Sequence, residues 1–416
     1  MPLPRFEPAA TLRPFRLARE EPLSAVGAPY VTVLADGGGP ARLALASGED
    51  RIEAHYDGES CWLEVTGDGR RLRHRRPRHA RPRGEVAQVA LTLTGSRATL
   101  AVREDGRWTV RAVAGLRGRL ATHDEAWLAA LSAEGGELRG YGELGLRDLR
   151  LVSHADGTPY LEDGRAMLTA TSAGPGFFNT AHTSVWALDP DGLSLEHRSD
   201  VFFRRPDRPG VYGDHASHLV RDGDRWLMNT STWGDFDPKR KGATVGVTLA
   251  ETTADLLAGR HVLDTRPLSL PTTGFSSVGV WDPHLVRVDG SWLVAYVSAR
   301  RFFRFHPVLA AGTRLDDLSV LGAATELKET EGSTLLRVDG AWRLLASDGV
   351  DKSYPVFDLG MRQVGRLEAP YPSNIPWPTL LPTDDGWLLV GFDGEPAGGP
   401  LAGYGTHGSV RVARSV

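Results

Sequence analysis

The 416-residue sequence has only one cysteine, Cys61, which excludes an internal disulfide. It has no apolar run near the roughly 18 residues that a membrane-spanning helix needs, so we expect no membrane partner. Residues 1–22 lack the continuous apolar stretch of a secretory signal, which predicts a cytoplasmic protein. A net charge of −4 gives no general attraction for nucleic acid, and no nucleic-acid partner is expected.

One segment departs from this charge balance. Residues 70–83 hold eight Arg and two His, without aromatic residues between them. Such a run can pair with the phosphates or carboxylates of an acidic polymer. A charged stretch interrupted by proline is more typical of a solvated loop between strands, and that is our prediction.

Turn-forming residues are plentiful, with 48 Gly and 27 Pro, and long helical periodicity is scarce. Residues 1–152 hold strand-like runs separated by turns, which predict an N-terminal β-sandwich-like domain with an irregular leader. A short helix is predicted within residues 122–136, which start with helix-capping residues and end with a Gly pair. In this domain Trp62 and Trp108 are more typical of core packing than of sugar stacking.

From residue 153 the chain repeats one arrangement. A polar residue precedes a short apolar strand, a glycine turn follows, and a second strand comes next, often with a Trp. The five copies start at Asp156, Asp214, Asp282, Glu331 and Asn374, which are 58, 68, 49 and 43 residues apart. These spacings suit the four-stranded blades of a β-propeller. We therefore predict an all-β chain with a five-bladed β-propeller over residues 153–416, whose five leading residues meet at one end of the axis.

The stretches "WDPHL" at 281–285 and "EGST" at 331–334, with an Asp-Gly hairpin between them, carry a resemblance. Their order and spacing resemble glycoside hydrolase family 43 and its five-bladed relatives in families 32, 62 and 117. The resemblance covers residues 153–416. It implies an Asp general base in the first blade, a later Asp that tunes a pKa, and a Glu general acid. Matched to this sequence, these roles fall on Asp156, Asp282 and Glu331.

The resemblance also implies a substrate class. It points to an inverting, exo-acting α-L-arabinofuranosidase or β-xylosidase-like enzyme whose partner is an oligosaccharide or small glycoside. No cofactor is required, and a central structural cation such as calcium is implied, with His407 as its candidate ligand. The sequence does not predict the oligomeric state.

The chemistry of inversion supports the carboxylate set. It needs one protonated carboxyl at the leaving oxygen and one carboxylate that activates water on the opposite face. An ionised Asp282 would raise the pKa of Glu331 by like-charge repulsion. Asp156 stands in "ADGT", where the family usually has an Asp-Pro pair. Asp148 in "LRDLRLV" is the alternative base, although we assign that strand to the end of the sandwich.

Substrate-binding candidates come from the starts of the copies and from the loops after each second strand. They are Asp214, His215, Trp281, Phe177, Phe178, Trp233, Arg301, Asn374 and Trp377. For any single aromatic residue among them, core packing is an equal alternative.

Two other functions stay open. A retaining fructofuranosidase-type enzyme would have an Asn-Asp-Pro leader in blade one and a Cys after the acid, whereas this chain has "ADGT" and Gly332. A non-catalytic carbohydrate-binding propeller would lack the base. The separation of the two carboxyl groups distinguishes the alternatives: about 6.5–9.5 Å indicates inversion and about 5–5.5 Å indicates retention.

Overall fold

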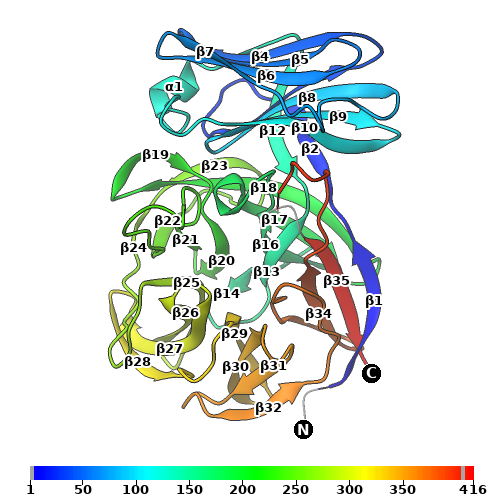
Figure 1. Ribbon diagram of the computed structural model, residues 1–416. Helices are drawn as coiled ribbons and strands as arrows, with labels where there is room; N and C mark the ends of the chain where they lie inside the picture. The colour runs from blue at the N-terminus through cyan, green and yellow to red at the C-terminus, as the bar shows by residue number, and fades with distance from the viewer. Residues whose placement is uncertain (1–3, 404–407) are drawn as a thin grey trace.

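The computed structural model describes residues 4–403 and 408–416. His407, the candidate cation ligand, lies outside these residues. The chain forms two bodies, an N-terminal two-sheet domain above a five-bladed propeller (Figure 1). The described residues hold one α-helix, α1 (Glu125–Ala129), and one 3-10 helix, η1 (Phe178–Thr180). Among them no helix is long and apolar enough to cross a membrane.

The N-terminal domain contains two antiparallel sheets. The six-stranded sheet runs in the order β10 (Arg107–Gly115), β9 (Arg97–Glu104), β8 (Val86–Thr94), β3 (Tyr30–Asp36), β12 (Glu137–Glu143) and β2 (Arg16–Pro22). The five-stranded sheet runs in the order β11 (Ser132–Glu134), β4 (Ala41–Ser47), β5 (Asp50–Tyr56), β6 (Cys61–Gly67) and β7 (Arg70–His74).

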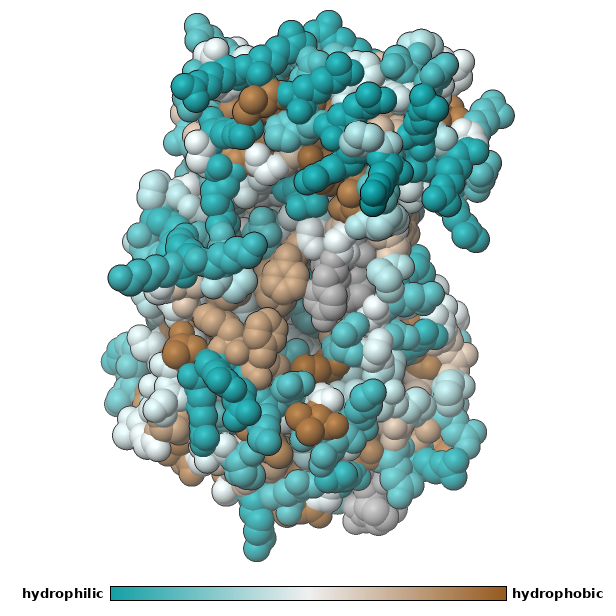
Figure 2. All heavy atoms as spheres, viewed as in Figure 1, coloured by the Kyte–Doolittle hydropathy of each residue, from teal (hydrophilic) through white to brown (hydrophobic). Residues whose placement is uncertain are grey.

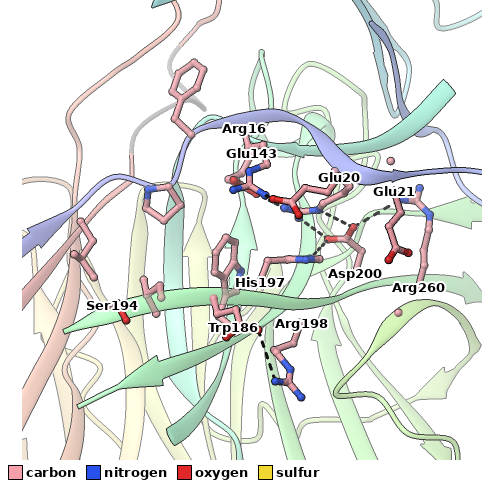
Figure 3. A pocket seen from close by; sticks show the side chains of 18 of the residues that line it. Arg16, Glu20, Glu21, Glu143, Trp186, Ser194, His197, Arg198, Asp200 and Arg260 are labelled. Atoms are coloured by element: carbon pink, nitrogen blue, oxygen red, sulfur yellow. Dashed lines mark hydrogen bonds and ion pairs between the residues drawn. The ribbon is translucent and has the colours of Figure 1, made fainter. Parts of the chain in front are cut away.

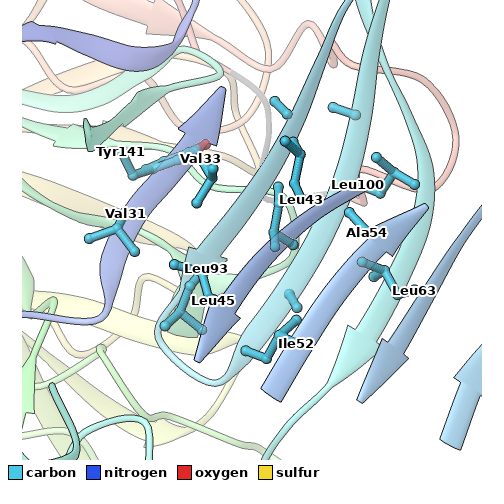
Figure 4. Close-up of a cluster of buried hydrophobic side chains, with 14 of the residues drawn as sticks. Val31, Val33, Leu43, Leu45, Ile52, Ala54, Leu63, Leu93, Leu100 and Tyr141 are labelled. Carbon is cyan, nitrogen blue, oxygen red and sulfur yellow. The ribbon is translucent and has the colours of Figure 1, made fainter. Parts of the chain in front are cut away.

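The two sheets share one hydrophobic core. Leu43 and Leu63 of the five-stranded sheet belong to the same buried cluster as Val33 and Leu93 of the six-stranded sheet (Figure 4). This follows from strand alternation, which sends every second side chain to the same face. Helix α1 begins after its N-cap, Asp124, and is shorter than the predicted helix, because the chain returns to a strand at β11.

The propeller has five blades around a central axis (Figure 1). The first contains β13 (Leu146–Leu151), β16 (Arg165–Ser172), β17 (His182–Asp189), β18 (Ser194–Arg205) and β19 (Arg208–Tyr212), with β15 (Leu161–Glu162) beside β16 and β23 (Gly259–Asp264) beside β18. The second contains β14 (Ser153–His154), β20 (His215–Asp222), β21 (Arg225–Ser231), β22 (Val247–Thr252) and β24 (Arg266–Pro267). The third contains β25 (Gly279–Val288), β26 (Ser291–Arg301), β27 (Arg304–Arg314) and β28 (Asp317–Ala323). The fourth contains β29 (Thr330–Val338), β30 (Ala341–Asp348), β31 (Tyr354–Phe357) and β32 (Gln363–Leu367). The fifth contains β33 (Thr379–Thr383), β34 (Gly386–Asp393), β35 (Ser409–Ser415) and β1 (Phe6–Leu12).

The boundary between the two bodies differs from the predicted one at residue 152. Strand β1 pairs antiparallel with β35, so the N-terminal strand completes the fifth blade. Strand β13 is the inner strand of the first blade and does not belong to the N-terminal sheets. The N-terminal domain is thus inserted between β1 and β13. A strand's local pattern does not name its partner, and these partners lie far away in the chain.

The inner strands of four blades share one irregularity. Each gains one residue relative to its neighbouring strand, at residues 147–150, 215–218, 281–284 and 331–334. Within each interval one residue has a left-handed φ: Asp148 (53°), Ala216 (60°), Asp282 (56°) and Gly332 (70°). Such a β-bulge bends the strand and re-aims the side chains beside it. These four residues are the structurally equivalent positions of the repeat.

Candidate active site

The inner strands of the propeller begin around a cavity of about 660 Å³ that is lined by residues of all five blades. Hydrophobic side chains gather around a hollow in the middle of the face in Figure 2. Three carboxyl groups line the cavity. Asp148 and Asp282 are the bulged residues of β13 and β25, and Glu331 directly precedes the bulge of β29. The bulge thus brings residues from the first, third and fourth blades to one place.

Glu331 has a pKa suited to a proton donor. Burial first, and then the charge of Asp148, raise its pKa to about 8. A carboxyl with this pKa keeps its proton at neutral pH. The charge of Asp148 contributes to this rise, so ionisation of Asp148 favours the protonated form of Glu331. Opposite protonation states of two carboxyl groups in one cavity allow acid and base chemistry together.

Asp148 is the member of the set that forms an ion pair with a guanidinium, and its pKa is raised overall. Burial raises its pKa, whereas the Arg147 guanidinium, 3.6 Å away, the Thr171 hydroxyl and Arg150 lower it. Its side chain is 14% exposed, so the carboxylate remains open to the cavity. A carboxylate in this position can accept a proton from water or attack a substrate carbon.

Asp282 behaves differently from the sequence-based expectation. Burial first, then the charges of Glu331 and Asp148, raise its pKa well above the ordinary value. Arg150 and the backbone N–H of Gly332 oppose this rise. The raised pKa favours the protonated form of Asp282, and the charge that acts on Glu331 comes from Asp148 instead of Asp282. A side chain at Gly332 would clash with Trp377, because a Cβ there would lie 2.4 Å from the ring.

The predicted base, Asp156, does not line the cavity. It is exposed in the turn between β14 and β15, where it accepts hydrogen bonds from the Thr158 N–H (2.9 Å) and hydroxyl (2.7 Å). The prediction of Asp156 as the base is therefore wrong. It rested on the distance from Asp156 to the following Asp-Gly turn, and that distance does not mark the residue that faces the cavity. The alternative named from the sequence, Asp148, is the first-blade carboxyl that lines the cavity.

Two predicted substrate-binding residues also lie elsewhere. Asp214 is fully buried, forms a bidentate ion pair with Arg205 and accepts from the Gly234 N–H at 2.9 Å. It therefore joins the first blade to the second and does not line the cavity. Arg301 is exposed at the end of β26 and does not line the cavity. The other predicted residues do line it: His215, Trp281, Phe177, Phe178, Trp233, Asn374 and Trp377.

Two ring nitrogens in the cavity wall can form hydrogen bonds with substrate hydroxyls. The Nδ1–H of His215 donates to the Gly213 carbonyl at 3.0 Å, and burial lowers the pKa of the imidazole well below its usual value. The ring is therefore neutral and its Nε2 is a hydrogen-bond acceptor. Neither this Nε2 nor the indole Nε1–H of Trp377 has a partner among the described residues, although both are buried. Buried polar atoms normally find partners, so both suit a polyhydroxylated ligand.

Sequence reasoning missed several lining residues, among them Arg147, Phe236, Phe303, Phe305, Glu329, Lys352 and Tyr371. A usable signal was present. Each bulged residue is followed three positions later by Leu, in "DLRL" from 148, "ASHL" from 216, "DPHL" from 282 and "GSTL" from 332. Alignment on this Leu selects Asp148, whereas alignment on the Asp-Gly turns selects Asp156.

The third residue of this pattern lies beneath the cavity. Arg150 is buried and donates to the Ser333 carbonyl at 2.9 Å, and His218 stacks on His284 with ring centres 4.2 Å apart. The Nδ1 atoms of both histidines accept backbone N–H groups, from Leu285 and Leu335. Calcium takes oxygen ligands, and a buried guanidinium repels cations. The described residues at the axis therefore do not fit a calcium site.

One group of three metal-ligating side chains occurs among the described residues. Glu53, His55 and Glu64 lie on the five-stranded N-terminal sheet. Arg42, Arg51 and Arg71 form ion pairs with the two carboxylates of this group. These pairs already neutralise the charge that a cation would need.

A larger cavity, about 1060 Å³, lies between the N-terminal domain and the first blade (Figure 3). Its centre is Asp200, whose carboxylate pairs with Arg19 at 2.7 Å and accepts from the Nε2 atoms of His182 and His197, both at 3.0 Å. Arg19 also pairs with Glu143 at 2.6 Å. These partners outweigh burial and hold the pKa of Asp200 well below its usual value. The Asp200 carboxylate thus finds its partners within the protein, on both the N-terminal domain and the first blade, which is typical of a domain contact.

No protein-family model and no curated protein sequence match the chain. Solved structures of glycoside hydrolases are similar to it at low identity. A family 32 β-fructofuranosidase of Bombyx mori is 15% identical with a TM-score of 0.45, over 64% of this chain and 59% of that one. A family 43 enzyme of Xanthomonas citri, complexed with xylotriose, is 16% identical with a TM-score of 0.44, over 64% and 87%. An inulosucrase of Halalkalicoccus jeotgali, bound to kestose, is 14% identical with a TM-score of 0.48, over 65% and 85%.

Proposed function

We propose that this protein is a glycoside hydrolase that cleaves a terminal glycosidic bond by general acid and base catalysis. The observation that carries the proposal is the cavity with three carboxyl groups from three blades, one of which, Glu331, has a pKa of about 8. Glycoside hydrolysis needs a protonated and an ionised carboxyl around one bond. Glu331 and Asp148 meet this requirement at neutral pH.

The roles follow from the protonation states. Glu331 donates its proton to the leaving oxygen as the glycosidic bond breaks. The Asp148 carboxylate takes a proton from water that attacks the opposite face of the sugar, which inverts the configuration. Asp282 keeps its own proton and is a hydrogen-bond donor beside the reacting centre. His215 Nε2 and Trp377 Nε1 bind sugar hydroxyls.

The substrate class within this proposal comes from the sequence resemblance. We propose α-L-arabinofuranosides first and β-D-xylosides second, released from the end of a short oligosaccharide or small glycoside. A cavity of about 660 Å³ is of a size that holds a small ligand, which supports exo action. The non-catalytic alternative depended on a missing base, and the Asp148 carboxyl in the cavity supports catalysis instead.

The retaining alternative assigns Asp148 as a nucleophile that forms a covalent glycosyl intermediate. Its test is the anomeric configuration of the first product. Proton NMR of the initial product, recorded before mutarotation, should show the anomer opposite to that of the substrate. Release of the same anomer would replace inversion with retention, while the glycosidase proposal would remain.

The test of the proposal is hydrolysis of a panel of p-nitrophenyl glycosides by the wild type and by Glu331→Gln. We expect one sugar to be released, and a fall of at least about a hundredfold in the variant when a glycoside with an unactivated leaving group is used. Glu326→Gln, an exposed residue outside the cavity, is the matched control and should keep full activity. No turnover of any glycoside, together with a sugar that raises the melting temperature, would contradict the proposal and indicate a binding protein.

A further inference from the structure

One side of the active-site cavity is a continuous aromatic wall. Phe178 stacks on Trp233 with ring centres 4.5 Å apart, Trp233 contacts Phe236 at 4.9 Å, and Phe236 contacts Phe302 at 4.8 Å. These residues come from the loops between the second and third strands of the first three blades. The residues of these loops that line the cavity therefore carry rings and no hydroxyl, amide or charged groups.

The lining residues of the second and third blades offer little hydrogen bonding. They are His215, Ala216, Trp233, Phe236, Pro238, Trp281, Asp282, Phe302, Phe303 and Phe305. Only His215 and Asp282 in this set have polar side chains other than indoles, and both lie on the inner strands at the floor. Besides Asp282, the charged and amide side chains of the lining come from the first, fourth and fifth blades: Arg147, Asp148, Glu329, Glu331, Lys352 and Asn374.

Phe303 extends this wall to the mouth of the cavity. It lies at the tip of the hairpin between β26 and β27, and 68% of its surface is exposed. Its φ is +69°, a conformation that bulky side chains rarely adopt and that Gly or Asn would take more readily in a tight turn. A large exposed ring in an unfavourable backbone conformation indicates a role beyond folding.

The aromatic wall begins beside the candidate acid. Trp281 lies close enough to Glu331 to act on its pKa. The same indole lies parallel to Phe302, with ring centres 6.3 Å apart, and contacts Phe305 at 5.5 Å. A general acid protonates the leaving oxygen, so the leaving group begins beside Glu331 and within reach of Trp281. The wall that begins there is aromatic.

We propose that the leaving group is apolar, so the substrate is a glycoside of an alkyl or aryl alcohol, with the aglycone seated against Trp281, Phe302 and Phe303. The proposal rests on the proposed glycosidase function. A sugar in the same position could stack one face on a ring, but most of its hydroxyls would lose hydration without a hydrogen-bond partner along this wall, which favours an apolar group over a sugar. An alkyl or aryl group would gain apolar contact along the whole wall.

The test uses methyl, butyl, hexyl and octyl glycosides of the sugar that the p-nitrophenyl panel identifies. These alcohols leave with similar intrinsic ease, so differences in kcat/KM report contacts of the chain. We expect kcat/KM to rise about two- to fourfold per added methylene until the chain passes the mouth. The hexyl glycoside should also exceed the disaccharide with the same terminal sugar by at least about tenfold. A kcat/KM that does not change with chain length, or a disaccharide that is hydrolysed better than the hexyl glycoside, would overturn the inference. Either result would leave the glycosidase function intact.

Two variants connect the effect to the wall. Phe303→Ser should reduce the gain per methylene, mainly through a higher KM for the longer glycosides. Leu321→Ser, which removes a half-exposed apolar side chain from β28 of the same blade, should leave the gain and the activity unchanged. An equal gain in kcat/KM per methylene in Phe303→Ser and the wild type would contradict a role of Phe303 in binding the aglycone.

A binding measurement separates this inference from the proposed function. The Glu331→Gln protein is titrated by calorimetry with methyl and hexyl β-D-xyloside and methyl and hexyl α-L-arabinofuranoside. Tighter binding of a hexyl glycoside than of its methyl counterpart would support the apolar site even if the wild type hydrolysed nothing. Equal affinities, or no binding of either hexyl glycoside, would overturn it.

Discussion

Asp148 and Asp282 occupy the same position in two different blades: each is the extra residue of an inner-strand bulge, with φ values of 53° and 56°. The same position is Ala216 in the second blade and Gly332 in the fourth. Asp and Asn adopt a left-handed φ more readily than most side chains, which explains how carboxyl groups can stand there. One backbone feature, repeated by the fold, thus presents two carboxyl groups to one cavity while Glu331 enters from the adjacent position.

This arrangement predicts which first-blade carboxylate matters. Asp148→Asn removes the group that ionises in the cavity, so we expect kcat to fall by at least about a hundredfold. Asp156→Asn changes an exposed turn residue and should leave kcat within about twofold of wild type. Steady-state kinetics of the two variants on one substrate decide between the residues. Loss of activity in Asp156→Asn with full activity in Asp148→Asn would contradict the assignment.

The pH dependence of kcat/KM should show a basic limb near pH 8. Glu331 acts only when protonated, and burial with the charge of Asp148 raises its pKa to about 8, so activity should decline above that pH. The Asp148 carboxyl must be ionised, and burial raises its pKa, so the acidic limb should lie above the ordinary range of an aspartate. The profile is measured on a glycoside with an unactivated leaving group. A basic limb that persists unchanged in the residual activity of Glu331→Gln would assign it to another group.

The sequence predicted Asp282 and Glu331 because each stands in a short local motif, "WDPHL" and "EGST". The first blade has no such motif, and two local patterns indicate different residues as the equivalent of Asp282. The turn pattern selected Asp156, although the Leu after each bulge selects Asp148. The role of Asp214 could also not be predicted from the local sequence, because its partner Arg205 comes to it only when the blades pack together. The same limit explains why β1 was not recognised as the last strand of the fifth blade.

The raised pKa of Glu331 also predicts how stability depends on pH. The folded state holds a proton to about pH 8, whereas an unfolded glutamate releases it near pH 4.5. This contribution to stability is fully present below pH 4.5 and is lost as the pH rises through 8, at roughly 1.4 kcal/mol per pH unit in between. The melting temperature of the wild type should therefore fall between pH 6 and 9 more steeply than that of Glu331→Gln. If the melting temperatures of the two proteins fall equally with pH, Glu331 is not buried in its neutral form.

The contact between the two bodies should depend on Asp200. Asp200→Asn removes the charge that faces Arg19, His182 and His197, and leaves the buried Arg19 with only Glu143. Breaking a buried ion pair on one side costs about 3 kcal/mol, so thermal unfolding should begin at a clearly lower temperature. Asp264→Asn is the matched control, because it removes an ion pair to Arg204 in which the Asp264 carboxylate is 85% exposed. This change should cost less than about 0.5 kcal/mol. The activity of folded Asp200→Asn should stay within about twofold of wild type, since Asp200 lies outside the active-site cavity. Equal melting temperatures for the two variants would show that this network does not hold the N-terminal domain on the propeller.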